Sequence, residues 1–160
     1  MRIVVMSDSH GNYNRVKEVV EQQMETAHTF IHLGDGLEEF EDVHHLYPYL
    51  HFVAVKGNND WGSTELKVRT LVCGDKNLLL CHGDLYNVKY SLELLRRTAI
   101  DAKADVALYG HTHRAQSDYL DGLYLVNPGC LCGSYGGKSS YLLLDITPQG
   151  IVPVPVELSH

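Results

Sequence analysis

The sequence contains no long apolar run and few cysteines, and both absences limit the class of protein. The apolar run at residues 3–6 is too short for the core of a signal peptide, and no segment approaches the length of a transmembrane helix. The four cysteines are irregularly spaced, which with the missing export signal indicates reduced thiols. We therefore expect a cytoplasmic protein that does not enter a membrane.

Positive charge is also scarce. The chain has 13 Lys and Arg residues against 20 Asp and Glu residues, a formal net charge of -7, and no run of Lys or Arg. This balance argues against an extended surface for nucleic acid. A phosphate substrate would need local positive charge, and bound metal ions could supply it.

Low-complexity segments and repeats of fixed period are absent as well. The composition, 44% apolar and 21% charged, is ordinary for a globular protein. A chain of 160 residues falls within the usual range of a single domain. We expect one domain that covers residues 1–160.

The first third of the chain alternates apolar strands with amphipathic helices. Strands are predicted at 3–6, 30–33 and 51–55, and helices at 13–27 and 37–47. This alternation predicts a largely parallel sheet covered on both faces.

After Asp60 the pattern changes to antiparallel pairing. Strands at 65–73 and 77–81 flank a predicted hairpin turn at 74–77, and the next apolar stripe predicts a helix at 88–102. Further strands are predicted at 106–109, 116–120, 123–126, 141–145 and 151–156. We expect two packed sheets with flanking helices.

Side chains that can bind metals recur where the predicted strands end. They are Asp8, His10, Asp35, Asn58, His82, His111 and His113. Open α/β folds build their sites at the edge where such strand ends meet. Carboxylate, amide and imidazole groups converging there indicate a metal centre.

Each motif taken singly also has a simpler explanation. Asn12 or Asn14 could cap the first helix, and Asp35 could be an N-cap with Glu38 completing a capping box. The stretch 57–60 could be a plain turn. A lone histidine after a strand is more often structural than a ligand.

The cysteines and glycines near the C-terminus suggest two weaker sites. Cys130 and Cys132, two residues apart, could hold a metal, but they have no second cysteine pair. Glycines at 129, 133, 136 and 137 suggest a nucleotide-binding module, yet their spacing matches neither a Walker loop nor a dinucleotide fingerprint.

The order of the motifs is more specific than any one of them. From Asp8 to His113 the sequence reads DxH, GD, GNxD, HG and GHxH, and in this it resembles the calcineurin-like metallophosphoesterase superfamily. The short chain and the Asn127-Pro128-Gly129 loop resemble its small single-domain phosphodiesterase branch. The resemblance implies an α/β fold, a four-layer α/β/β/α sandwich of two mixed sheets flanked by helices.

The resemblance also implies two divalent metal ions, Mn²⁺ first, with Fe, Ni²⁺ or Zn²⁺ as alternatives. Asp35 would bridge them, and hydroxide shared by the ions would be the nucleophile in place of any side chain. The implied ligands are Asp8, His10, Asp35 and His113 for one ion, and Asp35, Asn58, His82 and His111 for the other. Asn12, Asn59 and Asp60 are candidates for supporting or substrate contacts.

Three departures from the family pattern bear on the activity. Asn59 stands where many phosphatases of the superfamily carry a histidine that protonates the leaving group, and an amide cannot do this. Glu38 stands at the second acidic position of GDxxD, and the loop at 127–137 lacks the branch's usual Pro-Arg.

The expected function is therefore hydrolysis of a small phosphodiester. A phosphomonoesterase with the same site is one alternative, and a non-catalytic scaffold like the retromer subunit of this fold is another. Homo-oligomer formation is a possible assembly.

Overall fold

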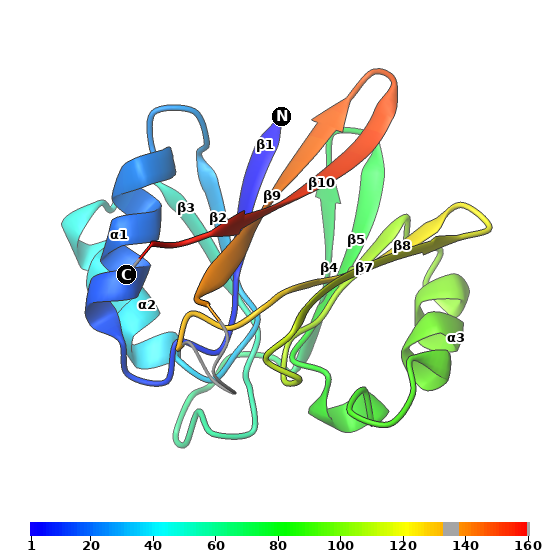
Figure 1. Cartoon of the computed structure of the whole chain (residues 1–160), viewed down its shortest axis with the longest axis horizontal. Helices are drawn as coiled ribbons and strands as arrows, with labels where there is room; N and C mark the ends of the chain where they lie inside the picture. Colours follow the sequence, from blue (N-terminus) through cyan, green and yellow to red (C-terminus); the bar gives the residue numbers. More distant parts are fainter. Residues whose placement is uncertain (133–137, 160) are drawn as a thin grey trace.

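The computed structural model describes residues 1–132 and 138–159, and it arranges the chain in four layers. Helices α1 (Tyr13–Gln23) and α2 (Leu37–Leu46) form one outer layer, two sheets the middle, and α3 (Glu93–Asp101) the other outer layer (Figure 1). The expected α/β/β/α sandwich is confirmed. None of the helices in the described residues is long and apolar enough to cross a membrane.

The first sheet has the strand order β10-β9-β1-β2-β3. Its strands are β1 (Arg2–Met6), β2 (Thr29–His32), β3 (His51–Ala54), β9 (Ser140–Thr147) and β10 (Gly150–Glu157). β1, β2 and β3 run parallel, while β9 and β10 are antiparallel additions. The carboxyl ends of the first three strands therefore lie at one edge.

The prediction that this sheet is covered on both faces is confirmed, and the alternation along β1 shows what covers each face. Val4 packs with Val16 and Phe40 beneath α1 and α2, whereas Ile3 and Val5 point the other way. That second face is buried against the second sheet. Both faces are apolar because one meets helices and the other meets strands.

The second sheet has the order β4-β5-β6-β8-β7. Its strands are β4 (Val68–Cys73), β5 (Lys76–Cys81), β6 (Val106–Leu108), β7 (Ala115–Leu120) and β8 (Leu123–Pro128). β4 and β5 form the expected antiparallel hairpin, while β5, β6 and β8 are parallel. The carboxyl ends of β5 and β6 consequently lie together too.

The predicted helix at 88–102 starts later than expected. Residues 88–92 form a loop instead, which follows the short 3-10 helix η1 (Asp84–Tyr86) and Asn87 in the left-handed region. Val88 is buried against Gly83, and Ser91 accepts a hydrogen bond from the first residue of α3, Glu93. The apolar spacing of the loop therefore reflects packing of the loop and not a helical turn.

Candidate metal centre

The candidate site lies where the carboxyl ends of β1, β2, β5 and β6 meet. The loop after β1 is tied to the loop after β2, because Asp8 N donates to Gly34 O at 3.0 Å and His10 N to Asp35 O at 2.9 Å. In the second sheet, Gly110 N donates to His82 O at 2.8 Å. The edge predicted from the sequence therefore joins both sheets.

Asp8 lies at the centre of three imidazole rings. Its buried Oδ1 is 3.1 Å from His113 Nε2, 3.4 Å from His10 Nε2 and 3.9 Å from His82 Nε2. Its Oδ2 accepts hydrogen bonds from Ser7 Oγ and the His111 backbone. Oδ1 has no hydrogen-bond partner among the described residues. A buried carboxylate oxygen in this state is costly unless a cation satisfies it.

Asp35 lies between the two halves of the cluster. Its Oδ2 is 3.2 Å from His82 Nε2 and 3.8 Å from His10 Nε2. His111 Nδ1 lies 3.2 Å from the same His82 nitrogen. Two groups of potential ligands share this carboxylate: Asp8, His10 and Asp35 in one, and Asp35, His82 and His111 in the other.

A backbone hydrogen bond on the side away from the carboxylates fixes the orientation of the His82 ring. Its Nδ1 donates to Leu33 O at 2.8 Å, which leaves Nε2 facing the carboxylates. Burial alone would lower the pKa of His82, but Asp35 and Asp8 outweigh burial and raise it. Burial alone would raise the pKa of Asp8, but His10, His113 and His82 outweigh burial and lower it. The cluster thus stabilises positive charge among its carboxylates.

Much of the candidate ligand set has an unusual backbone conformation. Among the described residues other than glycine, eight have positive φ, and five of these are candidate ligands. They are Asp8, His10, Asp35, His111 and His113. Such conformations cost roughly 1–2 kcal/mol each for ordinary residues and concentrate at functional sites. No signal in the sequence identified this feature.

Two glycines allow the loops of this site to touch. A Cβ added to Gly34 would lie 2.6 Å from Gly57 N, and one added to Gly57 would overlap Asp35 Oδ1. The GD and GN motifs therefore combine a polar residue with the close backbone approach that its position requires.

Asp60 holds the loop that carries Asp35. Its carboxylate accepts hydrogen bonds from the backbone of Asp35 at 2.7 Å, Gly36 at 2.9 Å, Leu37 at 3.1 Å and Gly57 at 2.8 Å. The capping-box alternative is wrong, because the N-cap of α2 is Gly36 and its capping oxygen comes from Asp60 across the loop.

The three asparagines considered for the site differ in their contacts. Asn59 Nδ2 donates to Asp35 Oδ2 at 3.0 Å, and its backbone N donates to Oδ1 at 2.8 Å. The Asn58 side chain is exposed and makes no hydrogen bond within the described part of the chain. Asn12 caps α1 by accepting from Arg15 N at 3.2 Å.

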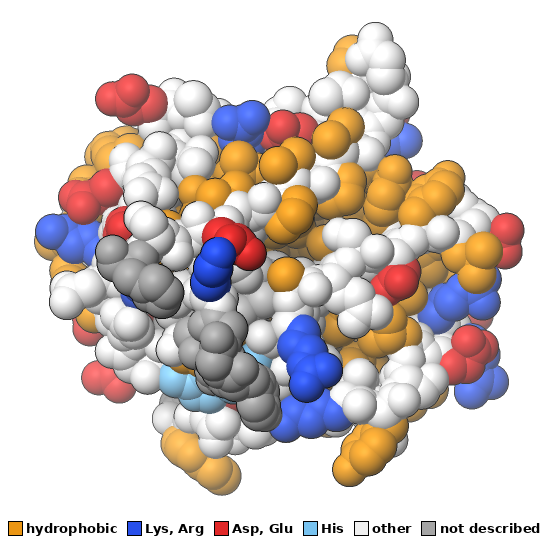
Figure 2. All heavy atoms as spheres, in the orientation of Figure 1, with side chains coloured by type: hydrophobic (Ala, Val, Ile, Leu, Met, Phe, Trp, Pro, Cys, Tyr) orange, Lys and Arg blue, Asp and Glu red, His pale blue; other side chains and the backbone are white. Residues whose placement is uncertain are grey.

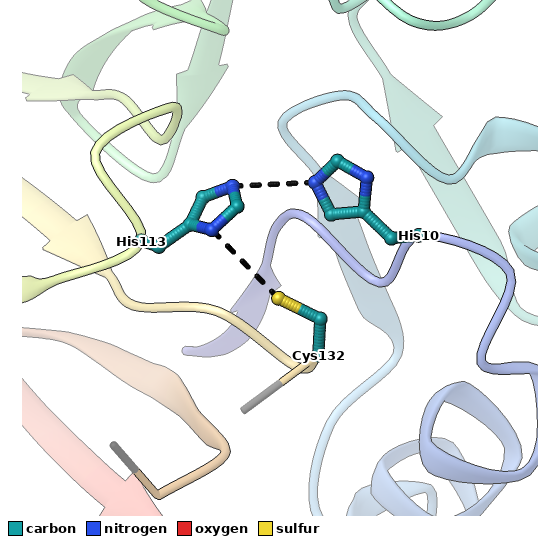
Figure 3. Close-up of side chains that lie close together, drawn as sticks. All are labelled: His10, His113 and Cys132. Carbon is teal, nitrogen blue, oxygen red and sulfur yellow. Dashed lines mark hydrogen bonds between the residues drawn. The ribbon is translucent and has the colours of Figure 1, made fainter. Parts of the chain in front are cut away.

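The cysteines after β8 depart from the expected reduced thiols. Cys130 and Cys132 are joined as a disulfide, whereas Cys73 and Cys81 are free and buried. Cys132 Sγ lies 3.8 Å from His113 Nδ1 (Figure 3). Of this pair, Cys132 groups with His10 and His113 as a potential ligand.

Gly133, Gly136 and Gly137 of the suggested nucleotide-binding loop lie outside the described residues.

A cleft of about 920 Å³ opens beside His10, Asp35 and Asn59. Its walls come from the first turns of α2 and the turn after β3, where Trp61 is 87% exposed. Several carboxylates line it, and Arg69 is its one Lys or Arg among the described lining residues. Histidine side chains reach the surface in the lower left part of the view in Figure 2.

Comparison with known proteins identifies relatives over most of the chain. The profile of the calcineurin-like phosphoesterase superfamily domain matches residues 1–149. A probable metallophosphoesterase of Bacillus subtilis (strain 168), YsnB, is 33% identical over 132 residues, which cover 82% of this chain and 75% of that protein. The phosphodiesterase MJ0936 of Methanocaldococcus jannaschii is 27% identical over 165 residues, covering 91% and 93% of the two chains.

Solved structures share the fold. A predicted phosphoesterase from Streptococcus pneumoniae TIGR4 superposes with a TM-score of 0.78 at 22% identity, covering 97% of each chain. Vps29 from Entamoeba histolytica, solved with Zn²⁺, superposes with a TM-score of 0.74 at 20% identity, covering 98% of this chain and 99% of that chain.

Proposed function

Because the chain belongs to the calcineurin-like phosphoesterase superfamily, we propose that it is a metal-dependent phosphodiesterase that acts on a small phosphodiester. The observation that carries the proposal is the orphaned, buried Asp8 Oδ1 surrounded by three imidazole nitrogens. The donor set of carboxylates and neutral imidazoles fits divalent transition metals.

The proposed ligands of one ion are Asp8, His10, Asp35 and His113, and those of the other are Asp35, Asn58, His82 and His111. When bound, the two ions would supply an activated water as nucleophile and positive charge opposite the phosphoryl oxygens. Mn²⁺ is the proposed metal.

The protein groups around the cleft favour a substrate of low negative charge. Glu38, Glu41 and Glu65 line the cleft, and Arg69 lies 3.4 Å from Glu65, which partly neutralises it. A diester carries one negative charge, whereas a monoester carries nearly two at neutral pH. The carboxylates therefore repel a monoester more strongly, and the exposed face of Trp61 offers apolar contact to an ester group.

Asn59 supports the same preference. Its amide donates to Asp35 and lines the cleft, and an amide cannot protonate a leaving group. Monoesters with poor leaving groups lose most from the absence of such an acid. A phosphomonoesterase is therefore the weaker alternative. A non-catalytic scaffold is the other alternative, and because Vps29 of this fold has been solved with Zn²⁺, turnover of a diester and not metal binding separates the two.

The experiment compares bis-p-nitrophenyl phosphate with p-nitrophenyl phosphate under identical metal conditions. We expect a higher kcat/KM for the diester, and in Asn59→His a gain, relative to the diester, for phenyl phosphate, a monoester with a poorer leaving group. Asn14→His, an exposed asparagine on α1, is the matched control and should keep the wild-type ratio. A native preference for the monoester would overturn the phosphodiesterase assignment.

A further inference from the structure

We propose that Cys130 and Cys132 form a reversible dithiol–disulfide switch that sets the metal affinity of the adjacent centre. The proposal rests on the metal ligation by Asp8 and His113 proposed above. Neither cysteine has a role in the proposed hydrolysis.

The two sulfur atoms contact two proposed ligands of the same ion. Cys132 Sγ is 3.8 Å from His113 Nδ1, and Cys130 Sγ is 3.2 Å from the backbone oxygen of Asp8. Figure 3 shows His113 between the sulfur of Cys132 on one side and His10 on the other. The opposite nitrogen of His113, Nε2, lies 3.1 Å from Asp8 Oδ1 and 3.2 Å from His10 Nε2. One ring therefore links the sulfur to the metal centre.

A hydrogen-bond acceptor behind a ligating histidine fixes the ring and strengthens it as a ligand. The sulfur of a reduced Cys132 can accept from the Nδ1–H of His113, which leaves the lone pair of Nε2 directed at the cluster. In the disulfide, the same sulfur is a weaker acceptor, and its position is constrained by Cys130. Oxidation should therefore weaken metal binding at this ion.

The positions of the pair permit the bond to form and break. The two Cα atoms are 5.2 Å apart, within the usual range for a disulfide. Cys130 is buried, while Cys132 is partly exposed and can meet a soluble thiol or disulfide first. Cys73 and Cys81 lie at opposite ends of the β4–β5 hairpin, and burial raises the pKa of Cys81 to about 12. These two cysteines serve as internal controls.

The oxidant is a low-molecular-weight disulfide such as glutathione disulfide. The Cys132 thiolate attacks one of its sulfurs, and one glutathione thiolate leaves as a mixed disulfide forms. The Cys130 thiolate then attacks the Cys132 sulfur and releases the second glutathione. Two electrons and two protons pass from the protein dithiol to give two glutathione thiols, and a dithiol reductant reverses the exchange.

The test measures metal affinity and redox state on the same samples. Metal-free full-length protein is equilibrated in glutathione buffers of graded composition, and the Cys130–Cys132 bond is quantified by alkylation and peptide mass mapping. Mn²⁺ binding is then followed by the paramagnetic resonance signal of free Mn²⁺. We expect one Mn²⁺ to bind roughly tenfold more tightly to reduced than to oxidised protein.

Variants separate the switch from general effects of oxidation. Cys132→Ser keeps a hydroxyl acceptor near His113 but cannot form the disulfide, so its Mn²⁺ affinity should not respond to the glutathione ratio. Cys73→Ser should keep the full response. Equal Mn²⁺ affinity of the reduced and oxidised wild type, or failure of the disulfide to form, would overturn the switch alone. Absence of Mn²⁺ binding in both states would overturn the proposed function together with it.

Discussion

Asn58 and Asn59 follow β3 in the same turn, but their side chains have different surroundings. Both side chains are exposed, but Asn59 donates to Asp35, whereas Asn58 makes no hydrogen bond within the described part of the chain. The Asn58 amide can therefore turn toward an ion, while the Asn59 amide is already held by Asp35, the carboxylate that two of the potential ligand groups share. The two residues should therefore affect the metal centre differently.

At the residue scale, Asp35→Ala should weaken the binding of both ions, and Asn58→Ala that of one. We expect at least a tenfold loss of affinity in each case. The free energy of unfolding of the metal-free protein should change little in Asn58→Ala, whose side chain is exposed, and should fall in Asp35→Ala, because Asp35 is buried and accepts two hydrogen bonds from Asn59. Metal stoichiometry by mass spectrometry and urea unfolding check this, with Asn14→Ala as control. Full occupancy in Asp35→Ala would show that the centre is misplaced.

The residue types at this centre were predictable, but their contacts were not. The sequence places Asp8, Asp35 and His82 after apolar strands, which is enough to predict that they meet. The capping of α2 by Asp60 and the positive φ of the ligands depend on loops that touch only in the folded chain. Taken alone, the sequence around Asp35 suggested a capping box, because nothing near it in the sequence indicates that Asp60, 25 residues further on, accepts the hydrogen bonds of this loop.

At the scale of elements, the loops after β2 and β3 interlock through Gly34 and Gly57. We predict that Gly57→Ala displaces Asp35 and lowers turnover at least tenfold, while the helices and sheets remain folded. Gly122→Ala is the control for turnover, because an added methyl there meets no atom within 4 Å and the strain from its positive φ is confined to the turn between β7 and β8. Circular dichroism and diester turnover measure the two effects. Unchanged turnover in Gly57→Ala would mean that this loop contact does not position the site.

Apolar periodicity predicted helices and strands correctly where the apolar residues of a segment are buried by that helix or strand itself. The hairpin of β4 and β5 was predicted because its two short apolar strands flank a Gly-Asp turn. The start of α3 was not predicted correctly. Val88 lies in the preceding loop and is buried against Gly83, although its spacing to the next apolar residues is that of a helix. Likewise, an apolar strand does not reveal whether a helix or another sheet covers its face.

At the scale of the whole molecule, one buried histidine should make stability depend on pH. His32 accepts a hydrogen bond from Gly34 N and lies 2.9 Å from Ser9 Oγ, and burial lowers its pKa from 6.5 to about 4. As the pH falls from 6.5 to about 4, His32 becomes protonated in the unfolded chain but stays neutral in the folded chain. The folded state should lose up to roughly 3 kcal/mol, at about 1.4 kcal/mol per pH unit.

The measurement is urea unfolding of metal-free protein between pH 7 and pH 4, compared with His32→Asn. The variant should be less stable at neutral pH, yet its stability should fall less steeply with acid because it lacks the titrating ring. Parallel pH profiles for the two proteins would contradict this role of His32.

We expect the activity of the whole molecule to depend on bound cations, because carboxylates line the cleft beside the candidate site. The most direct measurement is a titration of thoroughly demetallated protein with Mn²⁺ while hydrolysis of bis-p-nitrophenyl phosphate is followed. We predict no turnover without metal and full turnover when two ions are bound per chain. Full turnover by the demetallated protein, or turnover that Mn²⁺ does not change, would contradict a metal-dependent phosphodiesterase.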